Sequence, residues 1–410
     1  MAKKNAKTDR IVMKPVLGGV TAAQGFFASA LKAGIKTSGN LDAGLIVSKA
    51  ECSAAGAFTT NKVRASSVDW CEGAMPGRSI RAVFCNSGNA NACTGEQGAT
   101  DTRTIACSVA ATIDAAPKSV LVASTGVIGQ FLPMNSVLSA IPGLSRALSA
   151  TGGARFAQAI MTTDTRKKEC AYEMSLGKGK YRIGGCAKGS GMIHPKMATM
   201  LAFITSDAKI NAALLDQVVK GVVDRTFNNL TVDGDTSTND MVLVLANGMS
   251  GVGIESSAQL AQFEGALFTV CNTLCRKIAE DGEGATKRVE VTVHGGKTYS
   301  DAKAAAKAVA NSNLVKTALF GNDPNWGRIL CAIGYSGADF SKEKLVVKLC
   351  GVPVCKNLRP VAFPLQRLRE KLDRKVVAID VDLGLGPHSA IAHTCDLTYD
   401  YIKINAEYHT

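Results

Sequence analysis

The chain lacks several features by which an unfamiliar sequence is usually assigned to a class of protein. Only 5% of its 410 residues are aromatic, and no two cysteines form a C-x-x-C pair. No apolar run approaches the ~20 residues that a membrane span needs. The basic N-terminus, residues 1–10, is not followed by the apolar core of a signal peptide. We therefore expect a cytoplasmic protein without membrane association.

Cysteine and histidine usage gives no sign of a metal site or of a disulfide framework. There are 13 cysteines, and the pair Cys271 and Cys275 stands four residues apart in a helical-looking run, where small thiols share one buried face. The five histidines form no ligand cluster. Without a secretory signal, free reduced cysteines and no bound metal are expected.

The net charge of +13 invites the hypothesis of a nucleic-acid partner. A nucleic-acid-binding protein concentrates Lys and Arg in a stripe or tail, often with aromatic residues between them. Here the basic residues are spread along the chain, so no nucleic-acid partner is expected. A positive field also suits an enzyme with anionic amino-acid substrates. A basic, non-catalytic binding protein remains the remote alternative.

Short β-like runs alternate with alanine-rich helical runs along the chain, which favours a layered α/β architecture. The predicted strands are 44–47, 82–86, 120–124, 201–204, 241–246, 289–293 and 376–381, and the predicted helices are 98–115, 154–161, 212–227, 257–279 and 301–310. In helix 212–227 the apolar residues recur at a three-four spacing that buries one face.

The segment Lys188–Leu201, KGSGMIHPKMATML, places Thr199 between a glycine-rich turn and an apolar run. A threonine hydroxyl inside a chain is a poor nucleophile. If the bond between Ala198 and Thr199 is cut, however, the new α-amine titrates near pH ~8 and can act as the base for its own hydroxyl. The glycines and Pro195 suit a strained peptide at this bond. A plain loop leading into a strand is the alternative for such a segment.

The whole segment Lys188–Leu201 resembles the self-cleavage and nucleophile motif of the ornithine acetyltransferase (glutamate N-acetyltransferase) family of arginine biosynthesis. The resemblance implies an α/β/β/α sandwich, similar in outline to amidohydrolases with N-terminal nucleophiles. It also implies cleavage into an α chain, residues 1–198, and a β chain, residues 199–410. The two chains are expected to fold together, to stay associated and to form an α2β2 assembly.

The resemblance also assigns residues to the site. The run 123–129, ASTGVIG, looks like the family's oxyanion element, which implies that Thr125 and Gly126 stabilise the developing negative charge. Without the family context this run is a common turn. The positions matching the family's substrate-binding residues are Thr162, Lys188, Thr199, Glu283, Asn405 and Thr410. Lys188 is suited to a carboxylate and Glu283 to a cationic amine, and the chain end is expected to line the active site.

Three further motifs match the family without clear chemistry of their own, namely 86–92, 233–240 and 319–328. We interpret them as loops that shape the active site or an interface; 233–240 lacks the spacing of an EF-hand. Residues 1–10 and 342–373 match the family least.

The resemblance therefore implies an acetyltransferase that passes an acetyl group from N-acetyl-L-ornithine to L-glutamate through an acetyl ester on Thr199. The exchange of one amide for another requires no cofactor. Some members of the family also accept acetyl-CoA as donor, and the sequence leaves that question open. The alternative from a neighbouring class is an amidohydrolase or aminopeptidase with the same type of nucleophile, in which water resolves the acyl-enzyme.

Overall fold

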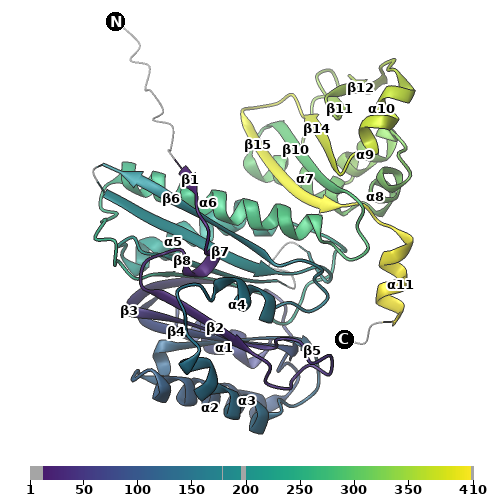
Figure 1. Ribbon diagram of the computed structural model, residues 1–410. Coiled ribbons are helices and arrows are strands. Elements are labelled where there is room, and N and C mark those ends of the chain that lie inside the picture. Colours follow the sequence, from purple (N-terminus) through teal and green to yellow (C-terminus); the bar gives the residue numbers. More distant parts are fainter. Residues whose placement is uncertain (1–12, 178, 195–199, 408–410) are drawn as a thin grey trace, which may run out of the picture.

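The long strand β3 (Ala43–Phe58) organises the larger of two domains. Its first part pairs with β2 (Phe26–Leu31) and β4 (Gly77–Asn89), and its second part also pairs with β9 (Met241–Ala246). The register shifts midway along β3, which is where an irregularity lets a strand bend. In this computed structural model, which describes residues 13–177, 179–194 and 200–407, the resulting nine-stranded sheet folds over into two layers (Figure 1).

Side-chain alternation explains why the strands of both layers are apolar throughout. All six residues of β9 are buried, because odd-numbered positions such as Leu243 face the core between the layers while even-numbered positions such as Val244 face the helices outside. Phe203 and Ile204 in β8 (Leu201–Ser206) divide in the same way. A strand that is buried on both faces reads as a continuous apolar run.

Helices cover the outer face of each layer. On one side α5 (Ala212–Arg225) and α6 (Ser257–Glu280) pack against the layer containing β7 (Gly179–Lys188), β8 and β9. On the other side α2 (Gly95–Thr112) and α3 (Met134–Arg146) pack against β3, β4 and β5 (Val120–Val127) (Figure 1). The order of layers is α/β/β/α, so the predicted fold class is confirmed. The apolar stripe of α5 lies in the core, as its spacing predicted, except for Leu214, which was expected in the stripe but is exposed.

The remaining elements of this domain complete the two layers. They are β1 (Met13–Pro15), β6 (Lys168–Leu176), α1 (Ser66–Gly73) and α4 (Gly153–Ala159). The strand order is β1-β6-β7-β8-β9-β3-β4-β5, with β2 on β3. The hairpin of β6 and β7 was not predicted from the sequence.

The smaller domain has its own core and, within residues 288–395, a six-stranded sheet in the order β13-β12-β11-β14-β10-β15. Its strands are β10 (Arg288–Gly296), β11 (Val346–Leu349), β12 (Val352–Lys356), β13 (Arg359–Pro360), β14 (Val376–Asp382) and β15 (His388–Cys395). Its helices are α7 (Tyr299–Asn311), α8 (Asn313–Phe320), α9 (Trp326–Gly334) and α10 (Leu365–Leu372). The segment 342–373, which matched the family least, builds one side of this sheet and α10.

The last described helix, α11 (Tyr399–Glu407), leaves the smaller domain and returns to the larger one (Figure 1). Its approach requires glycine at 284, where a Cβ atom would lie 2.4 Å from the amide nitrogen of Tyr401. The Thr398 hydroxyl also donates a hydrogen bond of 2.7 Å to the Gly284 carbonyl. These contacts place the end of the described chain beside the turn that carries Glu283.

Two other sequence predictions have structural outcomes. All 13 cysteines lie in the described part of the chain and are free, and Cys271 and Cys275 are both buried. Among the helices of the described residues, none is both long and apolar enough to cross a bilayer.

Candidate active site

A pocket lies where the ends of β5 and β7 meet the turn at Glu283 and the helix α11. Its lining residues are Thr125, Gly126, Ile128, Thr162, Thr163, Lys188, Gly191, Met192, Ser237, Thr238, Asn239, Glu283 and Asn405. Six positions that the sequence assigned to the site, from Thr125 to Asn405, are thus brought together. The predicted Ala198, Thr199 and Thr410 lie outside the described residues, so their roles stay predictions.

The predicted oxyanion element lies where two parallel strands approach very closely. Thr125 and Gly126 lie near the end of β5, where Gly126 pairs with Gly88 of β4. Gly126 has a φ of 137°, and a Cβ atom there would lie 2.3 Å from the carbonyl carbon of Gly88. Only glycine fits both the backbone angle and the space. The backbone at this bend is therefore held rigidly beside the pocket, as fixed hydrogen-bond donors require.

Asn239 links β5 to the residues that directly follow β4. Its side-chain amide donates to the carbonyls of Ala90 (2.6 Å) and Ser124 (2.8 Å), and it is buried. The Ser124 hydroxyl in turn donates to the Oδ1 atom of Asn86 at 2.7 Å. The motifs 86–92 and 233–240 therefore do shape the pocket, whereas 319–328 belongs to the smaller domain and contributes no lining residue. The sequence showed that loop 233–240 is polar, but it could not show that Ser237, Thr238 and Asn239 are the residues of this loop that line the pocket.

Two aspartates hold the chain on either side of the predicted cleavage site. The Asp233 carboxylate accepts hydrogen bonds from the N–H groups of Met192 (2.5 Å) and Ile193 (2.8 Å), and Met192 has a positive φ of 55°. On the other side the Oδ1 atom of Asp240 accepts from the Met200 N–H at 2.9 Å. Burial raises the pKa of Asp240 well above its usual range. The described residues on both sides of 195–199 are therefore anchored by these carboxylates.

Lys188 contributes a buried amino group to the pocket. It is the last residue of β7 and only 2% exposed. Burial lowers the pKa of its ammonium group, whereas the nearby Asp164 carboxylate acts to raise it. A buried lysine that lines a pocket and is balanced by carboxylates is suited to bind the carboxylate of a ligand.

Glu283 gives the pocket a second, opposite charge. It is 9% exposed and accepts a hydrogen bond of 2.9 Å at Oε2 from the side-chain amide of Asn405. A Cβ atom at position 191 would lie 2.2 Å from the Glu283 Oε2 atom. Gly191 therefore leaves space for this carboxylate, whereas Gly189, with a φ of 151°, adopts the positive φ that glycine permits.

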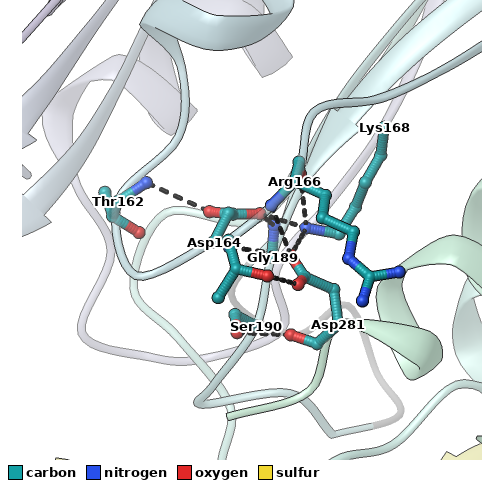
Figure 2. Close-up of polar contacts among 8 residues, drawn as sticks. Thr162, Asp164, Arg166, Lys168, Gly189, Ser190 and Asp281 are labelled. Carbon is teal, nitrogen blue, oxygen red and sulfur yellow. Dashed lines mark hydrogen bonds and ion pairs between the residues drawn. The ribbon is translucent and has the colours of Figure 1, made fainter.

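A buried cluster that the sequence did not reveal lies beside Thr162 and Lys188. Figure 2 shows the Lys168 ammonium between the carboxylates of Asp164 and Asp281, at 2.6 Å and 2.5 Å. Burial acts to raise the pKa of Asp164, but Lys188, Lys168 and the Gly189 N–H outweigh it and lower the pKa to about 2. Asp164 is therefore ionised at neutral pH. The nearest sequence signal was the basic run 166–168, which by itself does not indicate a buried ion pair.

Comparison with known proteins gives a consistent result. The chain matches the model of the ArgJ family over residues 27–410. The arginine biosynthesis bifunctional protein ArgJ of Symbiobacterium thermophilum is 49% identical over 402 residues, covering 97% of this chain and 100% of that protein. The ArgJ protein of Listeria monocytogenes is 44% identical over 402 residues, with 97% and 100% covered.

Two solved structures also match. A chain of the ArgJ protein from Bacillus halodurans is 41% identical with a TM-score of 0.49, covering 51% of this chain and 98% of that chain. The ornithine acetyltransferase complexed with ornithine from Mycobacterium tuberculosis is 38% identical with a TM-score of 0.42, covering 45% and 98%.

Proposed function

Because this chain belongs to the ArgJ family, we propose that it is an acetyltransferase of arginine biosynthesis that moves the acetyl group of N-acetyl-L-ornithine to L-glutamate. The observation that carries this proposal is the pocket itself. It combines a rigid backbone bend at Gly126, a buried ammonium at Lys188 and a carboxylate at Glu283. N-acetylornithine presents the complementary groups, namely an acetamide, an α-carboxylate and a cationic amine.

In the proposed reaction the Thr199 hydroxyl attacks the acetamide carbonyl, and the freed α-amine of Thr199 takes the hydroxyl proton. Thr125 and Gly126 stabilise the tetrahedral oxyanion. The C–N bond then breaks, the amine nitrogen of ornithine receives the proton, and the acetyl group remains as an ester. The α-amine of glutamate attacks this ester in the reverse sequence. Lys188 binds the α-carboxylate, and Glu283 binds the side-chain amine of ornithine.

Thr199 becomes an N-terminal residue by self-cleavage after Ala198 in this proposal. The segment to be cut connects β7 to β8, and these strands are antiparallel neighbours in which Lys188 pairs with Leu201. Chains 1–198 and 199–410 would consequently share a single sheet, with α11 of the second chain beside the pocket. The shared sheet supports the proposal that the chains stay associated after cleavage, in an α2β2 assembly in the cytoplasm.

We further propose that no cofactor or metal is required, since the reaction exchanges one amide for another through an ester on the enzyme. The relatives are named bifunctional, which favours acetyl-CoA as a second acetyl donor. Acetylation of glutamate by the purified protein with acetyl-CoA alone tests this extension, and its absence would restrict the enzyme to N-acetylornithine. Neither the hydrolase nor the nucleic-acid-binding alternative has comparable support.

Denaturing mass spectrometry after brief incubation with N-acetyl-L-ornithine tests the central proposal. We expect two fragments divided between Ala198 and Thr199, with one acetyl group on the fragment that begins at Thr199. Thr199→Ala is expected to give a single uncut chain, whereas Thr199→Ser keeps a hydroxyl and should still be cleaved. Normal cleavage of Thr199→Ala would refute the mechanism. Cleavage without acetylation would favour the hydrolase.

A further inference from the structure

The buried cluster of Asp164, Lys168 and Asp281 has no role in the reaction described above. Lys168 is 1% exposed, and the two aspartates are buried as well. Burying charged groups costs free energy unless each has partners, so a cluster of three charges beside a pocket calls for an explanation. Asp281 binds Lys168 and the backbone N–H groups of Thr165 and Arg166, which secures the far end of the cluster.

Asp164 connects this cluster to the pocket through the backbone. Its Oδ2 atom accepts a hydrogen bond from the Thr162 N–H at 3.0 Å, and its Oδ1 atom accepts from the Gly189 N–H at 2.7 Å and from Lys168 at 2.6 Å (Figure 2). Thr162 lines the pocket, and Gly189 directly follows Lys188. One carboxylate therefore holds two of the segments that carry substrate-binding positions.

The charge on Lys188 is set by groups from several elements. Those that interact with it are Asp164, Asp240, Glu283, Cys85, Lys168 and Lys36. Burial disfavours the ammonium form, and of the surrounding groups the Asp164 carboxylate opposes burial most strongly. Lys168 acts in the opposite direction, because it is a like charge. The two members of the Asp164–Lys168 ion pair therefore have opposite effects on Lys188.

On the basis of the proposed function, we propose that Asp164, oriented by Lys168 and Asp281, is a positioning residue that keeps Lys188 in its carboxylate-binding ammonium form and holds Thr162 and Gly189 at the pocket. Asp164 does not touch the reacting atoms. It acts by stabilising the charge of Lys188 and by accepting hydrogen bonds from the backbone N–H groups of Thr162 and Gly189.

A merely structural cluster makes a different prediction. If the three residues only stabilise the fold, breaking the ion pair from either side leaves a buried charge unpaired and damages the protein in the same way. If the cluster sets the charge of Lys188, removing the negative partner and removing the positive partner shift the titration of Lys188 in opposite directions. The sign of the shift therefore separates the two explanations.

The experiment measures kcat/KM for acetylation of the enzyme by N-acetyl-L-ornithine as a function of pH. Lys188 is cationic below its pKa, so carboxylate binding is lost as the pH rises through that value, and this loss forms the alkaline limb. Asp164→Asn removes the main group that raises the pKa, and the alkaline limb should move to lower pH by about one unit or more. Lys168→Met removes a like charge, and the limb should move to higher pH.

N-acetyl-L-ornithinamide, which has no carboxylate, is the matched control substrate. Its kcat/KM should show no shift of the limb between variants, because its binding does not depend on the charge of Lys188. Asp281→Asn changes the charge of the cluster by the same amount as Asp164→Asn, but it keeps all three hydrogen bonds that Asp164 accepts. Since Asp281 contacts Lys168 and not Lys188, its shift should have the sign of the Asp164→Asn shift and be smaller.

Shifts of the same sign in Asp164→Asn and Lys168→Met, or equal effects on the acid and the amide, would overturn the proposal. If Asp164→Asn is not recovered as a folded protein, Lys168→Met and Asp281→Asn still predict opposite shifts, and agreement in sign between them would be equally decisive. Failure of the proposed function is distinguishable, because the unaltered enzyme would then show no acetylation by N-acetyl-L-ornithine at any pH.

Discussion

Replacing Gly126 with alanine tests how strictly the geometry of the proposed oxyanion element depends on the absence of a side chain at this position. A Cβ atom at this position would lie 2.3 Å from the Gly88 carbonyl carbon and 2.4 Å from the Asn89 amide nitrogen, where ordinary contact begins at 3.4 Å. Both atoms belong to the backbone of β4 and cannot rotate away. The strands must therefore separate by about 1 Å, or β5 must twist.

Two energetic costs, overpacking and backbone strain, determine the expected loss of stability. Overpacking an interior costs ~1–3 kcal/mol, and holding a non-glycine residue at the φ of 137° adds roughly another 1–3 kcal/mol. The folded state should thus lose about 2–6 kcal/mol. Displacing an oxyanion donor lowers kcat by about 10²–10³-fold. We expect a melting temperature several degrees lower and a loss of activity of that order.

Gly129→Ala is the matched control, because Gly129 lies in the same segment with a φ of 78° but has no atom within 4 Å of its Cβ position. Its cost should be limited to about 1–2 kcal/mol for the left-handed backbone, with little loss of kcat. Thermal unfolding and acetyl transfer are measured for both variants. If Gly126→Ala unfolds like Gly129→Ala and keeps a similar kcat, the close approach of β4 and β5 has no role in catalysis and the argument fails.

One substitution and one extension of the chain test the residues proposed to bind the substrate. Glu283→Gln keeps the shape of the side chain but removes its charge, so kcat/KM for N-acetyl-L-ornithine should fall about 10–100-fold, as for a lost hydrogen bond to a charged group. N-acetyl-L-norvaline, which lacks the amine, should be used equally well by both enzymes, and a parallel loss on this substrate would show that Glu283 does not bind the amine. Residues added beyond Thr410 should lower turnover more than the melting temperature, because the chain end is proposed to line the site. Unchanged kinetics in such an extended enzyme would remove that role.

The sequence by itself determined most of the larger elements. The strands 120–124, 201–204 and 241–246 and the helices 212–227 and 257–279 all lie within or close to observed elements. Strands that are buried on both faces are apolar at every position, and the helices α5 and α6 are apolar along one stripe, so local pattern suffices to find them. The helices α1, α3 and α8–α11 were missed.

The site was predicted from the sequence mainly by its resemblance to a family. Thr125, Gly126, Thr162, Lys188, Glu283 and Asn405 were named in advance and line one pocket. Their chemistry could be inferred from residue type, because an ammonium binds carboxylates and a carboxylate binds amines. The role of Gly191 could not be inferred, since it depends on the Glu283 side chain that occupies the space beside it.

What only the tertiary structure decided is which distant residues meet and what charge they carry there. The chain positions of Asp164, Lys168 and Asp281 are those of ordinary surface residues, and nothing in the local pattern indicates that they are buried together. Hydrophobic periodicity is a local property that the order of residues records directly. A buried charge is stabilised by its partners, and its protonation depends on burial and on those partners. The charges of this cluster therefore become defined only when Lys168 of β6 and Asp281 at the end of α6, which are 113 residues apart in the chain, come together.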